Sequence, residues 1–365
     1  MAGGHRIALI RGDGIGYDVS NAAVAVIDGS LDKIGISPLH YEEIKAGAGY
    51  YQETGKDIET GGEERAGAAD AIFLGAIGLP SIRHHDGTEI SPHLRLRDRY
   101  GLYAGVRPVK AYPSAPQRLA DPRAAQIDLV ILRESTEGLF YTAAVHGRCD
   151  IRGDEEVRDT LRITRTTTEK LHRFGFRLAE RRKSKGRPGL ITCVDKANVF
   201  ASMAFFRKIF NEIAPEFPDV EFGYNYVDAQ ALDLIRRPWD FDVLVMENMF
   251  GDILSDLAGG LVGGMGMAAC GEIGDEHGLF QPAHGSAPDI MGQDKANPLA
   301  AILSGALMLD YLSEKFADSG YADAALIIED AVQKGFEQTR LRPIEFGGDM
   351  GTKAVTREIL AIIAE

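Results

Sequence analysis

The sequence predicts an α/β protein in which helices cover a buried sheet. Short apolar runs lie at 6–10, 70–76, 127–134, 188–194 and 241–247, and each has the length of a buried strand. Longer segments with helical periodicity separate these runs, and this alternation is typical of α/β proteins. The chain has 365 residues, 45% of them hydrophobic and 26% charged, which suits a globular protein long enough for two domains.

Two helices are predicted from the spacing of particular residues. After Lys196, apolar side chains recur at spacings of four and three, at Val199, Met203, Phe206, Phe210 and Ile213. Asn297 and Pro298 predict the start of another helix, because asparagine caps well and proline suits the first helical position. The proline-rich segment 107–123 is predicted to be a loop or a crossing segment, and the polar segment 141–157 a surface arm.

Composition argues against several classes of partner. The formal net charge of −14 opposes nonspecific attraction to nucleic acid or to an anionic membrane. Cys149, Cys193 and Cys270 have no paired or metal-ligand spacing, so nothing in the cysteines requires an oxidising compartment. Neither a signal peptide nor a membrane-spanning run is recognisable. We therefore predict a cytoplasmic protein with no nucleic-acid partner and no membrane attachment.

The N-terminal motif "RGDGIG" invites comparison with dinucleotide-binding loops. Its glycines, Gly12, Gly14 and Gly16, alternate strictly, whereas the fingerprint needs its third glycine three positions after the second. The motif is therefore interpreted as a strand-to-helix turn that needs glycine backbone freedom, and a nucleotide is expected to bind elsewhere.

Three arginines suggest recognition of a substrate with two carboxylates. Arg97, Arg107 and Arg133 each lie beside an expected strand or a glycine turn. Guanidinium groups prefer bidentate partners, so three that converge would suit a dicarboxylate. For any one of them taken singly, a surface salt bridge remains the favoured alternative.

Acidic and basic residues at expected strand-to-helix junctions suggest a metal site. If the segment from Asp252 to Leu261 is a helix, Asp252 and Asp256 share one face, with Ile253, Leu254, Leu257 and Leu261 on the other side. Such a pair could bind a hard divalent cation, or could equally be a solvated charge pair. Lys196 is expected where the helix dipole disfavours a protonated amine, and Asp228 at a similar junction. Each alone would more often be a cap or an exposed charge.

The segment "QPAHGSAPDIMGQDKANP" (281–298) is unusual in composition. His284, Gly285, Ser286 and Asp289 alternate with small residues in a loop that exposes backbone groups. Such a loop could lie along an adenosine moiety, and the alternative is a long irregular connection.

Seven motifs occur in order over nearly the whole chain, namely "RGDGIG", "LYAGVRP", "VDKANV", "YVDA", "FGDILSD", "HGSAPDI" and "ANP". In this set the chain resembles the isocitrate and isopropylmalate dehydrogenase family of metal-dependent β-decarboxylating dehydrogenases. The resemblance implies two α/β domains with a central cleft: a large domain from 1–102 and 263–365, and a small domain from 103–262 with the dimer interface and an arm near 136–157. It also implies a homodimer with shared active sites.

The resemblance further assigns site residues. It implies substrate contacts at Arg97, Arg107, Arg133, His93 and Leu94. It implies a cation, Mg²⁺ or Mn²⁺, held by Asp252 and Asp256 of one subunit and Asp228 of the other, and a catalytic role for Lys196 and Asp228. Nucleotide contacts are implied at His284, Gly285, Ser286, Ala287, Asp289, Ile290 and Asn297. NAD is expected as cofactor, because NADP-using members carry a lysine where this chain has Asp289, and a carboxylate repels a 2′-phosphate.

Two positions depart from the family pattern. The proton-donating tyrosine is replaced by Phe140, and the adjacent Tyr141 is predicted to take over if the chain shifts by one position. In the specificity segment, where isopropylmalate enzymes have a leucine-rich pocket, His93 and Leu94 are the two matching residues, so one wall is expected to stay apolar and the other to be polar. The predicted reaction is oxidative decarboxylation of a 3-substituted malate, with 3-isopropylmalate as the first choice. Tartrate, D-malate, isocitrate and homoisocitrate remain open, as does a noncatalytic regulatory homologue. A Mg²⁺-dependent phosphotransfer enzyme is less favoured, because no P-loop is present.

Overall fold

The computed structural model describes residues 4–144 and 149–365. One sheet of ten strands forms its centre, in the order β2-β1-β3-β12-β11-β4-β5-β10-β8-β9. Its strands are β1 (Arg6–Gly12), β2 (His40–Glu43), β3 (Ala71–Ala76), β4 (Ala104–Lys110), β5 (Asp128–Glu134), β8 (Leu190–Asp195), β9 (Glu221–Tyr226), β10 (Val243–Met246), β11 (Ala269–Ile273) and β12 (Gly278–Pro282). A separate hairpin consists of β6 (Asp150–Arg152) and β7 (Glu156–Arg158).

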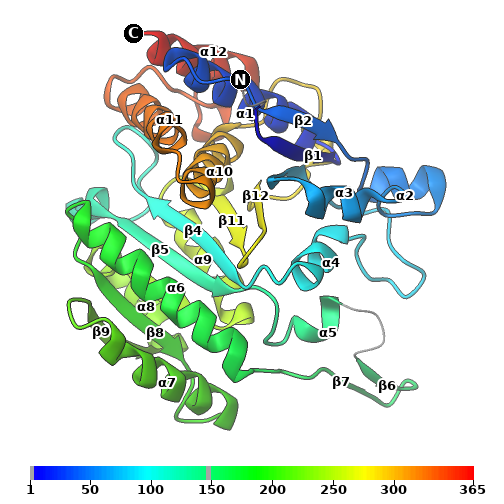
Figure 1. Ribbon diagram of the computed structural model, residues 1–365, viewed down its shortest axis with the longest axis vertical. Coiled ribbons are helices and arrows are strands. Elements are labelled where there is room, and N and C mark those ends of the chain that lie inside the picture. The colour runs from blue at the N-terminus through cyan, green and yellow to red at the C-terminus, as the bar shows by residue number, and fades with distance from the viewer. Residues whose placement is uncertain (1–3, 145–148) are drawn as a thin grey trace.

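Helices cover the sheet, as Figure 1 shows. They are α1 (Gly16–Lys33), α2 (Ala48–Thr54), α3 (Gly62–Ala68), α4 (Pro92–Arg99), α5 (Tyr141–Ala144), α6 (Arg165–Ser184), α7 (Ala201–Ile213), α8 (Val227–Arg236), α9 (Asn248–Leu261), α10 (Leu299–Phe316), α11 (Ser319–Glu337) and α12 (Thr352–Ala364). The predicted α/β class is confirmed. None of the helices in the described ranges is long and apolar enough to span a membrane.

The sheet is parallel towards both edges and antiparallel in the middle. On one side β2, β1, β3 and β12 run parallel, and on the other side β5, β10, β8 and β9 do so. Between them, β11 pairs antiparallel with β12 and β4, and β4 pairs antiparallel with β5. The predicted strands correspond to β1, β3, β5, β8 and β10, whose apolar side chains are buried by helices.

The hydrophobic core is divided into groups of residues, and each group draws mainly on particular parts of the sequence. The largest group joins β1, β3, α1, α10, α11 and α12, so both chain ends contribute to it. Two other groups lie around β5, β8 and β10 and are built mostly from the middle of the sequence. In Figure 1 the two chain ends lie close together, on the same side of the molecule. The domain boundaries inferred from the resemblance stay a prediction.

The prediction that 107–123 is a loop is wrong at its start, because β4 continues to Lys110. Proline in a central strand removes a ladder hydrogen bond and is usually excluded. Pro108 is tolerated because the pairing of β11 with β4 covers only 104–106, so the strand has one neighbour at this position.

Two predicted helix starts are displaced. Helix α7 begins at Ala201, after a turn that follows Lys196, and Val199 is 60% exposed and outside the buried face. Helix α9 begins at Asn248, four residues before the predicted start, with the Glu247 side chain accepting from Phe250 N at 3.3 Å. Ile253, predicted to share the apolar side of the helix with Leu254, is 58% exposed, whereas Leu254 is buried.

The structure of the remaining two segments is closer to what the sequence predicted. Asn297 Oδ1 accepts a hydrogen bond from Leu299 N at 3.2 Å at the start of α10. In the segment predicted to be an arm, the described part contains the β6–β7 hairpin, whose residues are all exposed. Residues 145–148 of that segment lie outside the described ranges.

Candidate active site

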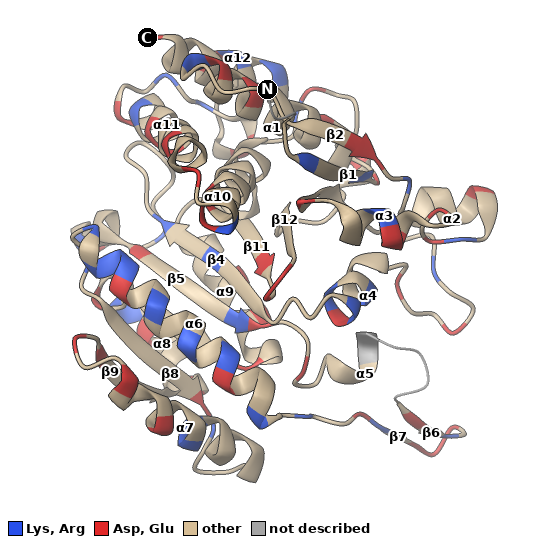
Figure 2. Ribbon diagram, viewed as in Figure 1, with Lys and Arg blue, Asp and Glu red and all other residues tan. Residues whose placement is uncertain are grey.

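The three arginines predicted to bind substrate are brought together by strand register. Gly105 of β4 pairs with Arg133 of β5 on one side and with Glu272 of β11 on the other. Residues paired across an antiparallel ladder point to the same face, and so does Arg107, two positions along β4. Arg97 reaches this face from α4 and is ion-paired with Glu272, Nη2 to Oε1, at 2.8 Å. Figure 2 shows basic segments on α4, β4 and β5 and an acidic one on β11.

These arginines are held by contacts within the chain. Arg133 donates from Nε and Nη2 to Asn248 Oδ1 at 2.9 and 2.6 Å, and its Nη1 is ion-paired with Asp252. Arg107 Nη1 donates to Ser255 Oγ at 2.6 Å and lies 3.8 Å from an Asp256 carboxylate oxygen. Helix α9 therefore supplies the partners of both strand arginines.

Burial and mutual repulsion shape the charge of this cluster. Arg133 is only 2% exposed, and burial together with the nearby Arg107 and Arg97 lowers its pKa to about 10. A guanidinium with this pKa still carries its charge at neutral pH. The three arginines thus form a buried cationic surface, which suits an anionic ligand.

The predicted metal ligands lie on α9 and are partly exposed. Asp252 and Asp256 are one helical turn apart, with side chains 40% and 58% exposed. Burial and the neighbouring Asp252 raise the pKa of Asp256, although Arg107 opposes them. In the described part of the chain, no three His, Cys, Asp or Glu side chains are grouped closely enough to hold a metal ion. Asp228 therefore does not complete a set with these two aspartates within one chain.

Lys196 and Asp228 form a pair of their own. Lys196 follows β8, Asp228 lies in the first turn of α8, and the lysine ammonium is ion-paired with the Asp228 carboxylate. This contact lowers the pKa of Asp228, whose side chain is 68% exposed. The helix-dipole argument for Lys196 is wrong, because α7 begins at Ala201, beyond the reach of a dipole effect.

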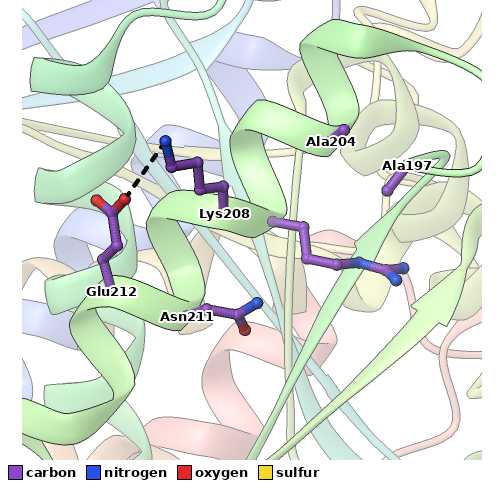
Figure 3. Close-up of a pocket in the computed structure, with 6 residues that line it drawn as sticks. Ala197, Ala204, Lys208, Asn211 and Glu212 are labelled. Atoms are coloured by element: carbon purple, nitrogen blue, oxygen red, sulfur yellow. Dashed lines mark ion pairs between the residues drawn. The ribbon is translucent and has the colours of Figure 1, made fainter.

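A surface hollow lies beside this pair on α7, with a volume of about 470 Å³. Figure 3 shows its lining residues, Ala197, Ala204, Arg207, Lys208, Asn211 and Glu212. Arg207 is already occupied by Asp195, with contacts of 2.7 and 2.8 Å. None of the predicted site residues lines this hollow, and it is separate from the arginine cluster and the aspartates of α9.

The predicted nucleotide loop is fixed against the glycine turn after β1. Ile15 N donates to Ser286 O at 2.8 Å, and the Ser286 hydroxyl donates to Gly78 O. Gly14 has a φ of +54°, and a Cβ there would lie 2.0 Å from Ser286 O, so only glycine allows this approach. The glycine turn therefore supports the 284–290 loop, in line with its interpretation as a structural turn.

Other members of this loop differ in exposure. Ala287 has a φ of +36°, and Gly285, Ala287 and Asp289 are exposed. His284 has a buried Nε2 without a hydrogen-bond partner among the described residues, and burial lowers its pKa. Ile290 packs partly against the chain-end core, and Asn297 Nδ2 donates to Glu345 at 2.9 Å. An exposed backbone and an unpartnered ring nitrogen are compatible with a bound nucleotide.

Asp13 is a structural residue of the same region that the sequence patterns did not single out. Its carboxylate accepts hydrogen bonds from the backbone N–H groups of Ala48, Gly49 and Gly78, each at 2.8 Å. Asp13 is only 4% exposed, so one buried side chain ties three loops together. An acid between two glycines directly after a strand was the signal in the sequence.

The structure places Phe140, and not Tyr141, towards the arginines. The Arg133 guanidinium lies 4.7 Å from the centre of the Phe140 ring, whereas the Tyr141 ring stacks on Arg162 at 3.8 Å. A pair of backbone hydrogen bonds between Gly138 and Arg162 fixes the register of this segment. The one-position shift required by the Tyr141 hypothesis is therefore absent, and the identity of the proton donor stays a prediction.

His93 and Leu94 lie in the first turn of α4, one turn before Arg97. Burial and the field of Arg97 lower the pKa of His93 to about 3, so its imidazole is neutral at physiological pH. Its Nδ1 is buried and has no hydrogen-bond partner among the described residues. Leu94 is partly buried, so the predicted wall combines one apolar side chain with one polar one.

Comparison with known proteins finds similarity over the whole chain. Residues 6–363 match the family model described as isocitrate/isopropylmalate dehydrogenase. A 3-isopropylmalate/3-methylmalate dehydrogenase of Methanocaldococcus jannaschii is 39% identical, over 99% of this chain and 99% of that protein. A 3-isopropylmalate dehydrogenase of Heyndrickxia coagulans is 39% identical, over 91% of this chain and 89% of that protein.

Solved structures give the same result. An isocitrate dehydrogenase of Methylococcus capsulatus is 34% identical with a TM-score of 0.84, covering 99% of this chain and 100% of that chain. A beta-decarboxylating dehydrogenase of Thermococcus kodakarensis is 35% identical with a TM-score of 0.78, covering 99% and 96%. The predicted fold is confirmed, and relatives named for different activities share it.

Proposed function

Because the chain belongs to the isocitrate/isopropylmalate dehydrogenase family, we propose that it catalyses NAD-dependent oxidative decarboxylation of a 3-substituted malate, with 3-isopropylmalate as the favoured substrate. The observation that carries this proposal is the convergence of Arg97, Arg107 and Arg133 on one buried face. Three fixed guanidiniums suit the two carboxylates of a malate, and the names of the relatives support the same substrate class.

Asp252 and Asp256 are the residues proposed to hold Mg²⁺ or Mn²⁺, with Asp228 supplied by a second copy of the chain. Carboxylate oxygens one turn apart suit a hard cation, and partial exposure leaves both accessible. When bound, the cation supplies Lewis acidity that favours ionisation of the substrate hydroxyl and stabilises the charge left after decarboxylation. Arg107 and Arg133 would then orient the substrate carboxylates.

Lys196 is the proposed proton carrier. Its ammonium is held by Asp228, and its side chain is 24% exposed, so it can exchange protons with a ligand or with water. In the proposed site the Lys196 ammonium first loses a proton to water, and the neutral amine then accepts the proton of the substrate hydroxyl. Tyr141 is left without an assigned step, because its ring faces Arg162.

His284, Gly285, Ser286, Ala287, Asp289, Ile290 and Asn297 are the residues proposed to hold the adenosine side of NAD. Asp289 is exposed at the turn that follows "HGSAP", where its carboxylate can accept from ribose hydroxyls and repel a 2′-phosphate. We expect a higher kcat/KM with NAD than with NADP, and a shift of about tenfold in this ratio in Asp289→Lys. Steady-state kinetics with both cofactors checks this. A wild-type preference for NADP would contradict the assignment.

A homodimer is proposed because the metal set is incomplete in one chain. Apolar side chains on the outer surfaces of α8 and α9 support it, since Leu232 is 53% exposed, Ile235 is 45% exposed and Ile253 is 58% exposed. Exposed apolar side chains on two helices that contact each other are typical of an interaction site. We also propose the domain division 1–102 with 263–365 against 103–262, and a cytoplasmic location, which suits the free Cys149, Cys193 and Cys270.

A substrate panel tests the proposal. The purified protein with Mn²⁺ and NAD is incubated with 3-isopropylmalate, D-malate, tartrate, isocitrate or homoisocitrate, and NADH is followed by absorbance. We expect the highest kcat/KM with 3-isopropylmalate, although neutral His93 in the wall keeps smaller or more polar malates in contention. Absence of NADH with every substrate would favour the noncatalytic alternative.

A further inference from the structure

Glu272 is a buried carboxylate in the middle of the arginine cluster. It lies on β11, is 0% exposed, and has Arg97 as its ion-pair partner. No sequence motif predicted a role for it. An acid among arginines assigned to anion binding weakens that binding, and a buried charge is costly unless it is well paired. Its presence therefore calls for a functional explanation.

Glu272 is only half satisfied. Its Oε1 contacts Arg97 and also accepts from Cys270 Sγ at 3.5 Å. Its Oε2 is buried and makes no hydrogen bond of normal geometry among the described residues, although the nearby Ser135 hydroxyl helps to lower the pKa of Glu272. This oxygen lies over Gly105, where an added Cβ would be 3.0 Å from it. This oxygen thus lies over β4, the strand that carries Arg107.

Other side chains of the cluster also carry unsatisfied polar atoms. Arg97 Nε, Arg107 Nε and His93 Nδ1 are all buried without a partner in the described ranges. The field of Glu272 also acts on His93, at the wall expected to face the substituent at C3 of the substrate. Native proteins leave few such atoms unpaired, and a cluster of them indicates a place where a ligand supplies the missing partners.

The charge states in the cluster are defined by their neighbours. Burial alone would raise the pKa of Glu272, but Arg97, Arg107 and Arg133 outweigh it and lower that pKa, so the residue is an anion at neutral pH. His93 is neutral there. With Asp252 and Asp256 assigned to a divalent cation, three arginines and one glutamate leave two uncompensated positive charges.

We propose that Glu272 selects substrates by charge, favouring malates with an uncharged substituent at C3 over tricarboxylates such as isocitrate. Two net positive charges match two carboxylates. A third carboxylate at C3 would meet the Glu272 anion and the neutral His93 instead of a cation, and like charges in a buried site repel strongly. This inference rests on the proposed function, since it assumes that the arginine cluster binds the malate carboxylates.

Equilibrium binding tests the inference without requiring turnover. The affinities of the wild-type protein for 3-isopropylmalate and isocitrate are measured by calorimetry with Mn²⁺, without NAD and at fixed ionic strength, because salt screens charge effects. We expect wild type to bind 3-isopropylmalate at least about tenfold more tightly, and Glu272→Gln to reduce this ratio about tenfold. Glu272→Asp, which keeps the charge, should retain the wild-type preference.

Asp242→Asn is the matched control. Asp242 is also 0% exposed and paired with an arginine, Arg182, but it precedes β10 at the opposite end of that strand from the site. The Asp242→Asn protein should be less stable than wild type, with the same ratio of affinities for 3-isopropylmalate and isocitrate. If circular dichroism shows that Glu272→Gln is unfolded, Glu272→Ser replaces it, because loss of the charge is the tested change.

The outcomes separate this inference from the proposed function. An unchanged affinity ratio in Glu272→Gln, or equal wild-type affinities for the two anions, would overturn charge selection even if NADH is formed. The expected shift in affinity without NADH formation from any malate would support charge selection and reject the proposed reaction.

Discussion

The two halves of the candidate site differ in how complete they are. The arginine half, with Arg97, Arg107, Arg133 and Glu272, is buried and is assembled within one chain by strand register. The carboxylate half lies on the surface of α8 and α9 and in the turn after β8, and Asp228 does not join Asp252 and Asp256 within the described part of one chain. Within the described residues, a single chain therefore assembles the arginine cluster but does not bring Asp228 to Asp252 and Asp256.

This difference has a physical cause. Arginines can be buried before substrate arrives because neighbouring carboxylates and Asn248 compensate them. Carboxylates that await a cation repel one another, so exposure to water lowers the cost of keeping them together. The comparison predicts that substitutions in the buried half affect stability and activity together, whereas those in the exposed half act mainly on activity. Asp252 links the two halves, because it is ion-paired with Arg133.

The largest effect is expected from Asp252→Asn, in the exposed half. Losing one anionic ligand should lower Mn²⁺-dependent turnover by at least about 1,000-fold, since cation stabilisation of developing charge is worth several kcal/mol. NADH formation is measured against Mn²⁺ concentration, with circular dichroism melting to confirm an unchanged fold. Wild-type activity at limiting Mn²⁺ would remove Asp252 from the metal site.

The next prediction concerns completion of the exposed half by a second chain. Lys196→Met and Asp252→Asn chains, each inactive alone, should give about half of wild-type activity as a heterodimer, because one of its two sites carries both defects and the other none. Heterodimers are isolated after co-expression with two different tags. Complete inactivity of purified heterodimers would mean that sites are not shared.

In the buried half, Arg133→Lys should lower both stability and affinity. Lysine cannot reproduce the two contacts with Asn248, and a buried acceptor left without its partners costs about 2 kcal/mol. Urea unfolding measures the free energy of unfolding, and KM for the malate substrate should rise as well.

Arg95→Lys serves as the control for this substitution. Arg95 also makes a two-point contact, with Asp57 at 2.7 and 3.0 Å, but its side chain is 40% exposed. Its loss should change the free energy of unfolding by less than about 1 kcal/mol. Equal destabilisation by the two substitutions would contradict the contrast between the halves.

The smallest effect is expected from Tyr141→Phe. The ring that stacks on Arg162 is retained, so kcat/KM should fall less than about threefold, whereas loss of a general acid costs about 100-fold or more. Steady-state NADH formation and deuterium placement in product made in heavy water report on both the rate and the proton delivery. A large loss with scrambled labelling would restore Tyr141 as the proton donor.

The sequence predicted the parts of the molecule that local patterns determine. Buried strands such as β5 and β10 were recognisable because long apolar runs need burial on both faces. The antiparallel strands β4 and β11 were missed, since Pro108 argued against a strand and pairing with β5 is not visible in local sequence.

Among the site residues, too, those in local motifs were predictable, and those that depend on contacts between distant segments were not. The arginines and aspartates lie in recognisable motifs, but Glu272 and Asp13 act through contacts that join distant segments, and single-sequence patterns do not report such contacts. The position of Phe140 depends on the hydrogen bonds between Gly138 and Arg162, which also required the structure.

The ladder between β11 and β4 joins the strands of the chain-end segments to those of the middle segment. Only three residue pairs form it, 271 with 106, 272 with 105 and 273 with 104, and Glu272 belongs to the central one. If one side of the sheet rotates against the other, the three residue pairs of this ladder are where the two sides move relative to each other. Glu272 and Arg107 lie on opposite sides of this ladder, so such a rotation would change the separation of their charges.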